Sequence, residues 1–290
     1  MIGQGDNLYN RSRGKIPFIP NSPNKIRRKD IFHYLQNLEV EIDRGLFSEN
    51  ELLLLQEALY GKFLDRTRRP FFLYHFLPLW MNSVQTLFRD CANPKIIELG
   101  CGTGASSLLF AMLGAQVIGI EMNADLVGIC NKRKRFYENY FGNINAKFYQ
   151  GNTFDFPFEE HPHVDGYFSL FAFNLMKPAY LLLARMIPSL KNGGKIMIID
   201  GNSNNFYSWI IPSRRRLGVF SPLMMRKELE NSGCRISKME THCAIPPFIF
   251  GSAIARSFSL RIENIVRFSG LHRFFAVSYS VVPEKISEDQ

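Results

Sequence analysis

The chain has 290 residues, of which 46% are hydrophobic and 21% charged, a composition that excludes disordered and collagen-like chains and indicates a globular protein with a sizeable core. Its formal net charge of +9 raises the question of a polyanionic partner, but the basic residues are divided among four separate runs, which solvated helix faces explain. The five cysteines show no C-x-x-C pair and no Cys/His ligand spacing, so we expect neither a disulfide framework nor a metal site, and a reducing, cytoplasmic location.

The first 90 residues contain two different patterns. Residues 1–30 combine prolines with basic and polar residues, which predicts a flexible basic arm, and they lack the apolar core of a secretory signal, so we expect no export by that route. Residues 31–90 repeat apolar residues at helical spacing, as in "ENELLLLQEALYGKFL", and predict a helical cap. The apolar stretch 71–81 is too short to span a membrane, and we expect a buried or interfacial helix there.

From residue 91 to residue 290, short apolar runs alternate with helical patterns, which predicts a doubly wound α/β domain. An apolar insertion at about 243–271 separates the last two strands, and these two can pair antiparallel at one edge. We therefore expect a mostly parallel, seven-stranded sheet with an antiparallel last strand. The expected strands are 95–99, 116–121, 146–151, 164–171, 195–200 (entered through a glycine turn at 191–194), 234–240 and 272–282, and the expected helices are 104–113, 124–140, 180–189 and 222–232.

The stretch "IELGCGTG" places a carboxylate and three glycines between the first of these strands and a helix. Such a loop lets the backbone approach a ligand and points helix amides at a negative group. Gly100, Gly102 and Ala105 satisfy the loose G-x-G-x-x-G/A pattern, so a dinucleotide has to be considered. Glu98, however, needs a cationic or hydrogen-bonding partner, and an amino group on the ligand would serve. Glu121 ends the next strand, where a carboxylate can accept both hydroxyls of a ribose.

An adenosine joined to an amino acid is S-adenosylmethionine, and the sequence resembles the class I S-adenosylmethionine-dependent methyltransferases from about residue 95 to residue 282. The motifs that carry the resemblance are "ELGCGTG", the acidic strand end "IEM", the strand exit "GNTFDFPF" and the glycine turn "LKNGGKIMII". The strand exit departs from the family's G-D-x-x-x-L-P-F, because Asn152 stands in place of the aspartate.

The resemblance implies a role for individual residues in holding S-adenosylmethionine. The glycines would shape the loop under the methionine moiety, with Glu98 reaching its amino group. Glu121 would hold the ribose hydroxyls. Met122, Asn152 and Phe154 would contact the adenine, although Met122 and Phe154 could equally be core residues. The whole implied set is Glu98, Gly100, Cys101, Gly102, Thr103, Gly104, Glu121, Met122, Asn152, Thr153, Phe154 and Ser169.

Methyl transfer is an in-line displacement at an activated sulfonium carbon, so the protein mainly aligns the nucleophile and needs a base only for a poor one. The stretch "SLFAFNL" after the fourth strand contains no histidine and no N/D-P-P-Y/F signature of methylation at a planar amino nitrogen, which argues against a nucleic acid acceptor. The remaining candidate bases are Asp200 at a strand end and His75 and Tyr74 in the cap. Asp200 could equally cap the next turn, and His75 could equally be a core histidine.

The acceptor walls of this fold come from the cap and the insertion, which here contain "PFFLYHFLPLW" and "IPPFIFG". These apolar segments predict a small-molecule or lipid-like acceptor and leave a peripheral membrane contact open, although ordinary packing on the sheet explains them equally well. A sugar acceptor stays open. Alternatives to a methyltransferase are a non-catalytic S-adenosylmethionine-binding protein and a dinucleotide-dependent oxidoreductase. The sequence leaves the oligomeric state and the acceptor atom undetermined.

Overall fold

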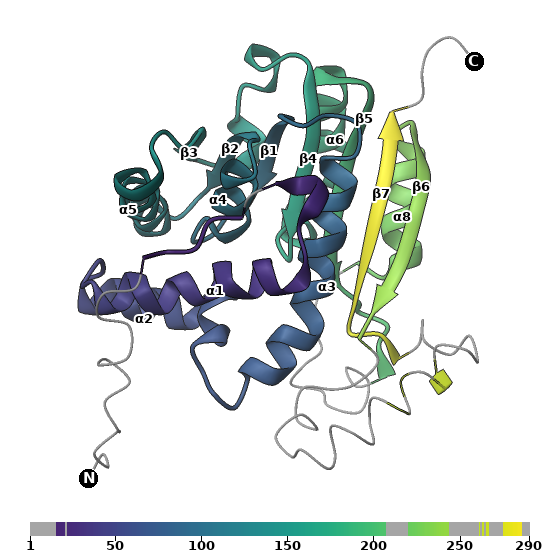
Figure 1. Cartoon of the computed structure of the whole chain (residues 1–290). Helices are drawn as coiled ribbons and strands as arrows, with labels where there is room; N and C mark the ends of the chain where they lie inside the picture. Colours follow the sequence, from purple (N-terminus) through teal and green to yellow (C-terminus); the bar gives the residue numbers. More distant parts are fainter. Residues whose placement is uncertain are drawn as a thin grey trace.

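A computed structural model describes residues 16–20, 22–206, 220–243, 261, 263, 265, 266 and 275–285. It shows an α/β sheet beside a group of amino-terminal helices (Figure 1). Three features predicted from sequence lie wholly or largely outside the described residues: the first half of the basic arm, the basic run at 214–216 and most of the apolar insertion.

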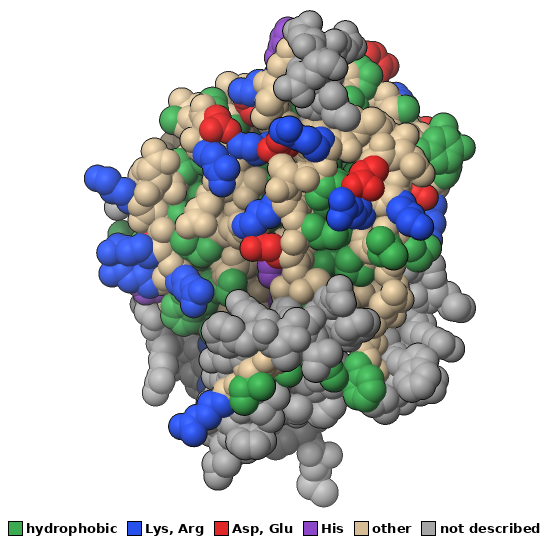
Figure 2. Space-filling view, turned by 90° about the vertical axis from the view of Figure 1, so that its right-hand side faces the viewer, with side chains coloured by type: hydrophobic (Ala, Val, Ile, Leu, Met, Phe, Trp, Pro, Cys, Tyr) green, Lys and Arg blue, Asp and Glu red, His purple; other side chains and the backbone are tan. Residues whose placement is uncertain are grey.

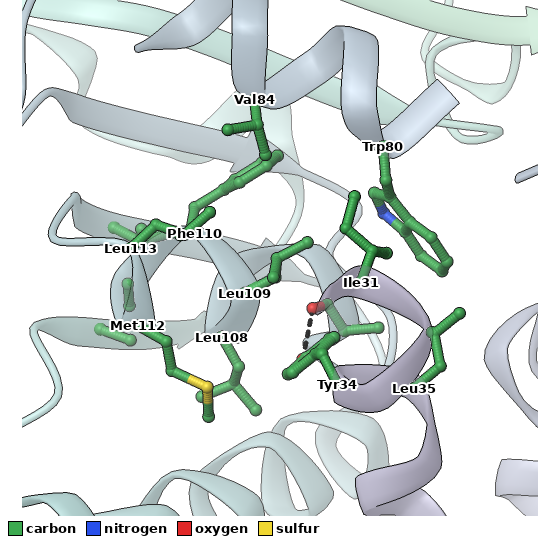
Figure 3. Packing of buried hydrophobic residues seen from close by; sticks show 14 of the residues in the cluster. Ile31, Tyr34, Leu35, Trp80, Val84, Leu108, Leu109, Phe110, Met112 and Leu113 are labelled. Carbon is green, nitrogen blue, oxygen red and sulfur yellow. Dashed lines mark hydrogen bonds between the residues drawn. The ribbon is translucent and has the colours of Figure 1, made fainter. Parts of the chain in front are cut away.

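The amino-terminal helices are α1 (Arg28–Asp43), α2 (Glu49–Glu57) and α3 (Arg69–Leu87). α2 starts at a capping box, in which the Ser48 hydroxyl accepts from the Glu51 amide and the Glu51 carboxylate accepts from the Ser48 amide. α1 and α3 share a hydrophobic cluster with α4, the first helix of the α/β domain (Figure 3). No helix in the described part of the chain combines the length and the apolarity that a bilayer crossing needs.

The sheet has seven strands in the order β3-β2-β1-β4-β5-β7-β6. β1 to β5 pair in parallel, and β7 lies antiparallel between β5 and β6. The mostly parallel sheet with an antiparallel last strand is therefore confirmed. The strands are β1 (Lys95–Leu99), β2 (Gln116–Glu121), β3 (Ala146–Gln150), β4 (Val164–Leu170), β5 (Leu190–Gly201), β6 (Cys234–His242) and β7 (Ser278–Lys285).

Helices cover both faces of the sheet, as parallel strands require. Successive strand residues point to opposite faces, so Ile96 joins a hydrophobic cluster with α1, α3 and α4, and Ile97 joins a second cluster with α6 and α8. The helices of the domain are α4 (Ala105–Met112), α5 (Ala124–Phe141), α6 (Ala179–Ser189) and α8 (Pro222–Asn231). Short 3₁₀ turns are η2 (Pro23–Lys25), η3 (Tyr60–Phe63), η4 (Thr153–Asp155), η5 (Phe158–Glu160) and η6 (Phe173–Leu175).

β5 and β7 differ most from the prediction at their ends, whereas β3, β4 and β6 differ there by only one or two residues. β5 begins at Leu190 and includes the predicted glycine turn, because Val164 pairs with Leu190 and Gly166 with Lys195. The extra residues on β5 form a bulge with Gly193 at φ +74°, so the glycine pair permits a bulge rather than a separate turn. β7 begins at Ser278 instead of residue 272, where its pairing with both neighbouring strands starts.

Charges of both signs are mixed on the face that Figure 2 presents, which is the β6 side of the molecule. Arg235 of β6 pairs with Glu284 of β7 at 3.2 Å, and Lys238 pairs with Glu240 at 2.9 Å. Interspersed exposed pairs of this kind produce no strong field of one sign. The described residues of this face therefore form no continuous basic surface for a polyanion.

Candidate cofactor site

The glycine loop joins β1 to α4 at the carboxyl edge of the parallel strands. Gly100, Gly102 and Gly104 have φ values of +69°, +54° and +73°, a region that favours glycine. A Cβ atom on Gly100 would lie 2.5 Å from the Cβ atom of Ala172, whereas one on Gly102 would meet no protein atom within 4 Å. Gly100 is thus required by packing within the protein, and Gly102 borders open space above the loop.

Side chains from β2 and α5 hold the backbone of this loop at Gly102. The Gly102 amide donates to Glu121 Oε2 at 2.9 Å, and the Cys130 thiol donates to the Gly102 carbonyl at 3.1 Å. Hydrogen bonding with Cys130, together with burial, raises the pKa of the Cys101 thiol well above its usual value. Cys101 therefore stays a neutral, packed thiol and is unsuited to act as a nucleophile.

Two further carbonyls of the loop accept hydrogen bonds from buried side chains on the cap side of the domain. Arg133 Nη1 donates to the Thr103 carbonyl at 2.7 Å, and the Tyr34 hydroxyl donates to the Ala105 carbonyl at 2.6 Å. The loop is consequently fixed by β2, by α5 and by α1 at once. Such pre-organisation suits a loop that binds a ligand through its backbone.

The ends of β2 and β3 lie next to the loop. Glu121 Oε1 accepts from the Asn123 amide at 3.0 Å, and the Glu121 carbonyl accepts from the Gly151 amide at 3.0 Å. Met122 follows at the strand end with 71% of its surface exposed, so it is not a core residue. Glu121, Met122 and the β3 exit therefore form one continuous rim beside the glycine loop.

The β3 exit contains the residues predicted to contact adenine. Asn152 is exposed, and its Oδ1 accepts from the Phe154 amide at 3.0 Å, which caps the turn η4. Phe154 is half-buried and packs partly on the second hydrophobic cluster, while Thr153 is buried. Asn152 thus has a local structural role in addition to the predicted ligand contact.

Comparison with known proteins finds similar sequences over this region. The family described as a methyltransferase domain matches residues 96–194, which run from β1 through the glycine loop and the ends of β2 and β3 into β5. This part of the chain is therefore similar to a methyltransferase domain. An uncharacterized methyltransferase of Staphylococcus carnosus is 30% identical over 111 residues, which cover 38% of this chain and 48% of that protein.

Two more distant similarities were found. A putative protein N5-glutamine methyltransferase of Methanocaldococcus jannaschii is 26% identical over 133 residues, covering 39% of this chain and 64% of that protein. The matches thus span less than two thirds of either curated relative. The fold is also that of a geranyl diphosphate methyltransferase solved with S-adenosylmethionine, with a TM-score of 0.55, 12% identity, and coverage of 72% of this chain and 85% of that chain.

The geometry of the candidate site is compatible with S-adenosylmethionine. The open space above Gly102 admits a ligand against the loop backbone, and the neighbouring Glu121 carboxylate retains lone pairs for hydroxyl donors beside its two amide bonds. The exposed Met122 offers an apolar surface on the same rim for a base. Glu121, Met122 and the loop glycines would therefore hold the cofactor.

Glu98 is held more deeply than the family resemblance implies. Glu98 is 2% exposed, and its carboxylate accepts a hydrogen bond from the Ser107 hydroxyl of α4. Burial raises the pKa of Glu98 to about 8, against the lowering effect of the bonds from Ser107 and Ser106. The carboxyl is thus mostly protonated at neutral pH, and its contact with the ligand amino group stays a prediction.

Ser169 lies within the sheet at the same end. It is 1% exposed, and its hydroxyl donates to the Leu99 carbonyl at 3.2 Å, joining β4 to the last residue of β1. Ser169 therefore supports the strand end from which the glycine loop departs. A direct contact with the cofactor stays a prediction for this residue.

Of the candidate bases, Asp200 lies near the end of β5 and His75 and Tyr74 lie in α3, and both Asp200 and His75 are buried. Asp200 Oδ2 accepts from the Asn174 amide of η6 at 2.8 Å, so it bonds the turn after β4 and not the turn that follows it in the chain. His75 Nε2 lies 2.7 Å from the Ser278 hydroxyl, and burial lowers the pKa of His75 to about 3, so the ring is neutral at physiological pH. Tyr74 is half-buried in α3.

Sequence reasoning missed the role of Arg133. It lies in the basic run at 132–135, which we assigned to a solvated helix face, but its side chain is fully buried. That interpretation is wrong for this residue. Cys130, Arg133 and Tyr137 are spaced by three and four residues, which places them on one face of α5, and this spacing was the available signal.

Proposed function

We propose that the chain is an S-adenosylmethionine-dependent methyltransferase that acts on a small apolar or lipid-like acceptor. The use of S-adenosylmethionine is supported by the position of the Glu121 carboxylate. This carboxylate accepts from the Gly102 amide at 2.9 Å and lies beside the open space at the glycine loop. S-adenosylmethionine bound there supplies an electrophilic methyl group. The protein then has to align the acceptor and exclude water.

The apolar acceptor is supported by aromatic side chains near the loop. Phe171 directly precedes Ala172, the residue that Gly100 approaches, and its ring lies 6.1 Å from the His75 ring and 5.6 Å from the Phe76 ring. α3 of the cap thus brings an aromatic wall close to the cofactor site. Such rings favour the binding of an apolar acceptor by burial of its surface.

The described residues on this side supply apolar rings rather than an accessible base. Asp200 and His75 are 3% and 4% exposed, and each has a hydrogen-bond partner within the protein. The same observation favours the second candidate function, a protein that binds S-adenosylmethionine without turnover. The segment after β4, Phe171 to Leu175, also lacks the N/D-P-P-Y/F signature, so we do not propose a glutamine or nucleic acid acceptor.

Calorimetric titration with S-adenosylhomocysteine, beside NADH, tests the cofactor. Micromolar binding of the first ligand alone supports the proposal, and a preference for NADH would revive the oxidoreductase alternative. The acceptor is tested by incubating the protein with methyl-labelled S-adenosylmethionine and a cell extract divided into lipid, polar small-molecule, protein and nucleic acid fractions. Label in the lipid or apolar small-molecule fraction is expected. Binding without label in any fraction would favour the non-catalytic alternative.

A further inference from the structure

A buried ion pair joins the amino-terminal cap to the methyltransferase domain. Arg133 of α5 donates to Glu41 of α1 through Nε at 2.8 Å and through Nη2 at 3.1 Å. Both side chains are completely buried, and the Tyr137 hydroxyl donates to the same carboxylate. The three groups form a closed polar cluster between two helices that are far apart in sequence.

Stability alone is a weak reason for this cluster. Removing two charges from water costs several kcal/mol for each ion, and apolar residues of similar volume often stabilise such a position as well or better. The third donor of the guanidinium suggests another role, because Arg133 Nη1 bonds the carbonyl of Thr103 in the glycine loop at 2.7 Å. Glu41 holds the guanidinium so that this donor faces the loop.

A second contact from α1 reaches the same region, and its side chain also interacts with Arg133. Tyr34, on the same helix as Glu41, donates its hydroxyl to the Ala105 carbonyl at the start of α4. Burial raises the pKa of Tyr34, so the hydroxyl stays protonated and remains a donor. Figure 3 shows Tyr34 with its helix neighbours Ile31 and Leu35 beside α4. α1 therefore touches the backbone on the carboxyl side of Gly102 at two carbonyls, once directly and once through Arg133.

We propose that Arg133 and Tyr34 are positioning residues for the cofactor. Through them, α1 helps to hold the glycine loop in the conformation that binds the cofactor. They act through the Thr103 and Ala105 carbonyls, which fix the conformation of the loop that Gly102 presents to the ligand. The inference rests on the proposed function, since it concerns binding at the same site. Because coupling between two sites is reciprocal, cofactor binding also strengthens the docking of α1.

The test compares the dissociation constant of S-adenosylhomocysteine, measured by calorimetry, for the wild type and three variants. Arg133→Lys keeps a cation beside Glu41 but cannot also reach Thr103, and Tyr34→Phe removes only the hydroxyl. Arg69→Lys is the matched control, because Arg69 bonds Glu39 of α1 at 2.6 Å and the carbonyl of Phe63 at 2.7 Å, both in the amino-terminal helices. We expect the dissociation constant to rise about tenfold for the first two variants, as one lost hydrogen bond implies, and less than about twofold for the control.

A second readout separates positioning from a general loss of stability. Thermal unfolding without ligand is expected to show comparable shifts for Tyr34→Phe and Arg69→Lys, while only Tyr34→Phe loses affinity. Saturating S-adenosylhomocysteine should slow amide exchange in α1 of the wild type, and should do so less in Tyr34→Phe. If Arg133→Lys fails to fold, Tyr34→Phe decides the question. Wild-type affinity in Tyr34→Phe overturns this inference alone, whereas a wild type that does not bind overturns the proposed function and this inference with it.

Discussion

Replacing Glu121 with glutamine tests the predicted ribose contact. In the structure, the two carboxylate oxygens accept from the amides of Gly102 and Asn123 at 2.9 and 3.0 Å. Glutamine has nearly the same shape but only one acceptor oxygen and no charge, so at least one charge-assisted bond is lost. Such a bond contributes about 1.5 to 3 kcal/mol, which corresponds to a rise of roughly 10- to 150-fold in the dissociation constant of S-adenosylhomocysteine.

The assay is calorimetry on the wild type, Glu121→Gln and Glu230→Gln. Glu230 is the control because it pairs with Arg226 on the exposed side of α8 and the change in chemistry is the same. Repeating the titration with a ligand that lacks the ribose 2′-hydroxyl completes a double-mutant cycle, in which the ligand change should matter less in Glu121→Gln. An affinity for Glu121→Gln within about threefold of the wild type would refute the ribose role, since even the weakest such bond exceeds this ratio.

Three further predictions concern the same region. Glu98 has a folded pKa of about 8 against an ordinary value of 4.5, so the unfolded state releases its proton first, and stability is expected to fall as the pH rises between these values. Urea unfolding at about pH 5 and about pH 8 should show this decline in the wild type and a flatter profile in Glu98→Gln; equal profiles would contradict the buried, protonated carboxyl. Gly102→Val is expected to abolish S-adenosylhomocysteine binding with a modest change in melting temperature, whereas Gly100→Ala should lower the melting temperature more, because its Cβ would collide with Ala172. Asp200→Asn should lower stability by about 1.5 to 3 kcal/mol and leave the affinity for S-adenosylhomocysteine unchanged, and a large loss of affinity would place Asp200 in the cofactor site instead.

The sequence predicted those features that depend on local chemistry. β1 and β2 have the predicted bounds because each is a short apolar run that ends in a glycine turn or an acidic residue. The left-handed glycines of the loop and the position of Glu121 at a strand end follow from the same patterns. These elements need only neighbouring residues to define them, so a single sequence was sufficient.

Features that depend on distant residues were not predictable in this way. The bulge in β5 arises from its register with Val164, and the burial of Arg133 arises from Glu41, far away in the chain. The protonated state of Glu98 depends on enclosure by α4 rather than on its motif. In each case the partner that determines the environment is supplied by tertiary packing, which residue type and spacing alone do not specify.

The place of β7 in the sheet has a consequence for the order of assembly. Strands β1 to β5 follow one another through local crossovers, but β6 contacts the rest of the sheet through β7, which comes later in the chain. During synthesis, β6 therefore has no strand to pair with in this sheet until residues 278–285 have emerged. Pairing across such a sequence separation is slow, because a long loop must close before any bond forms. β7, the last of the seven strands to be synthesised, therefore joins β6 to β5 and completes the sheet.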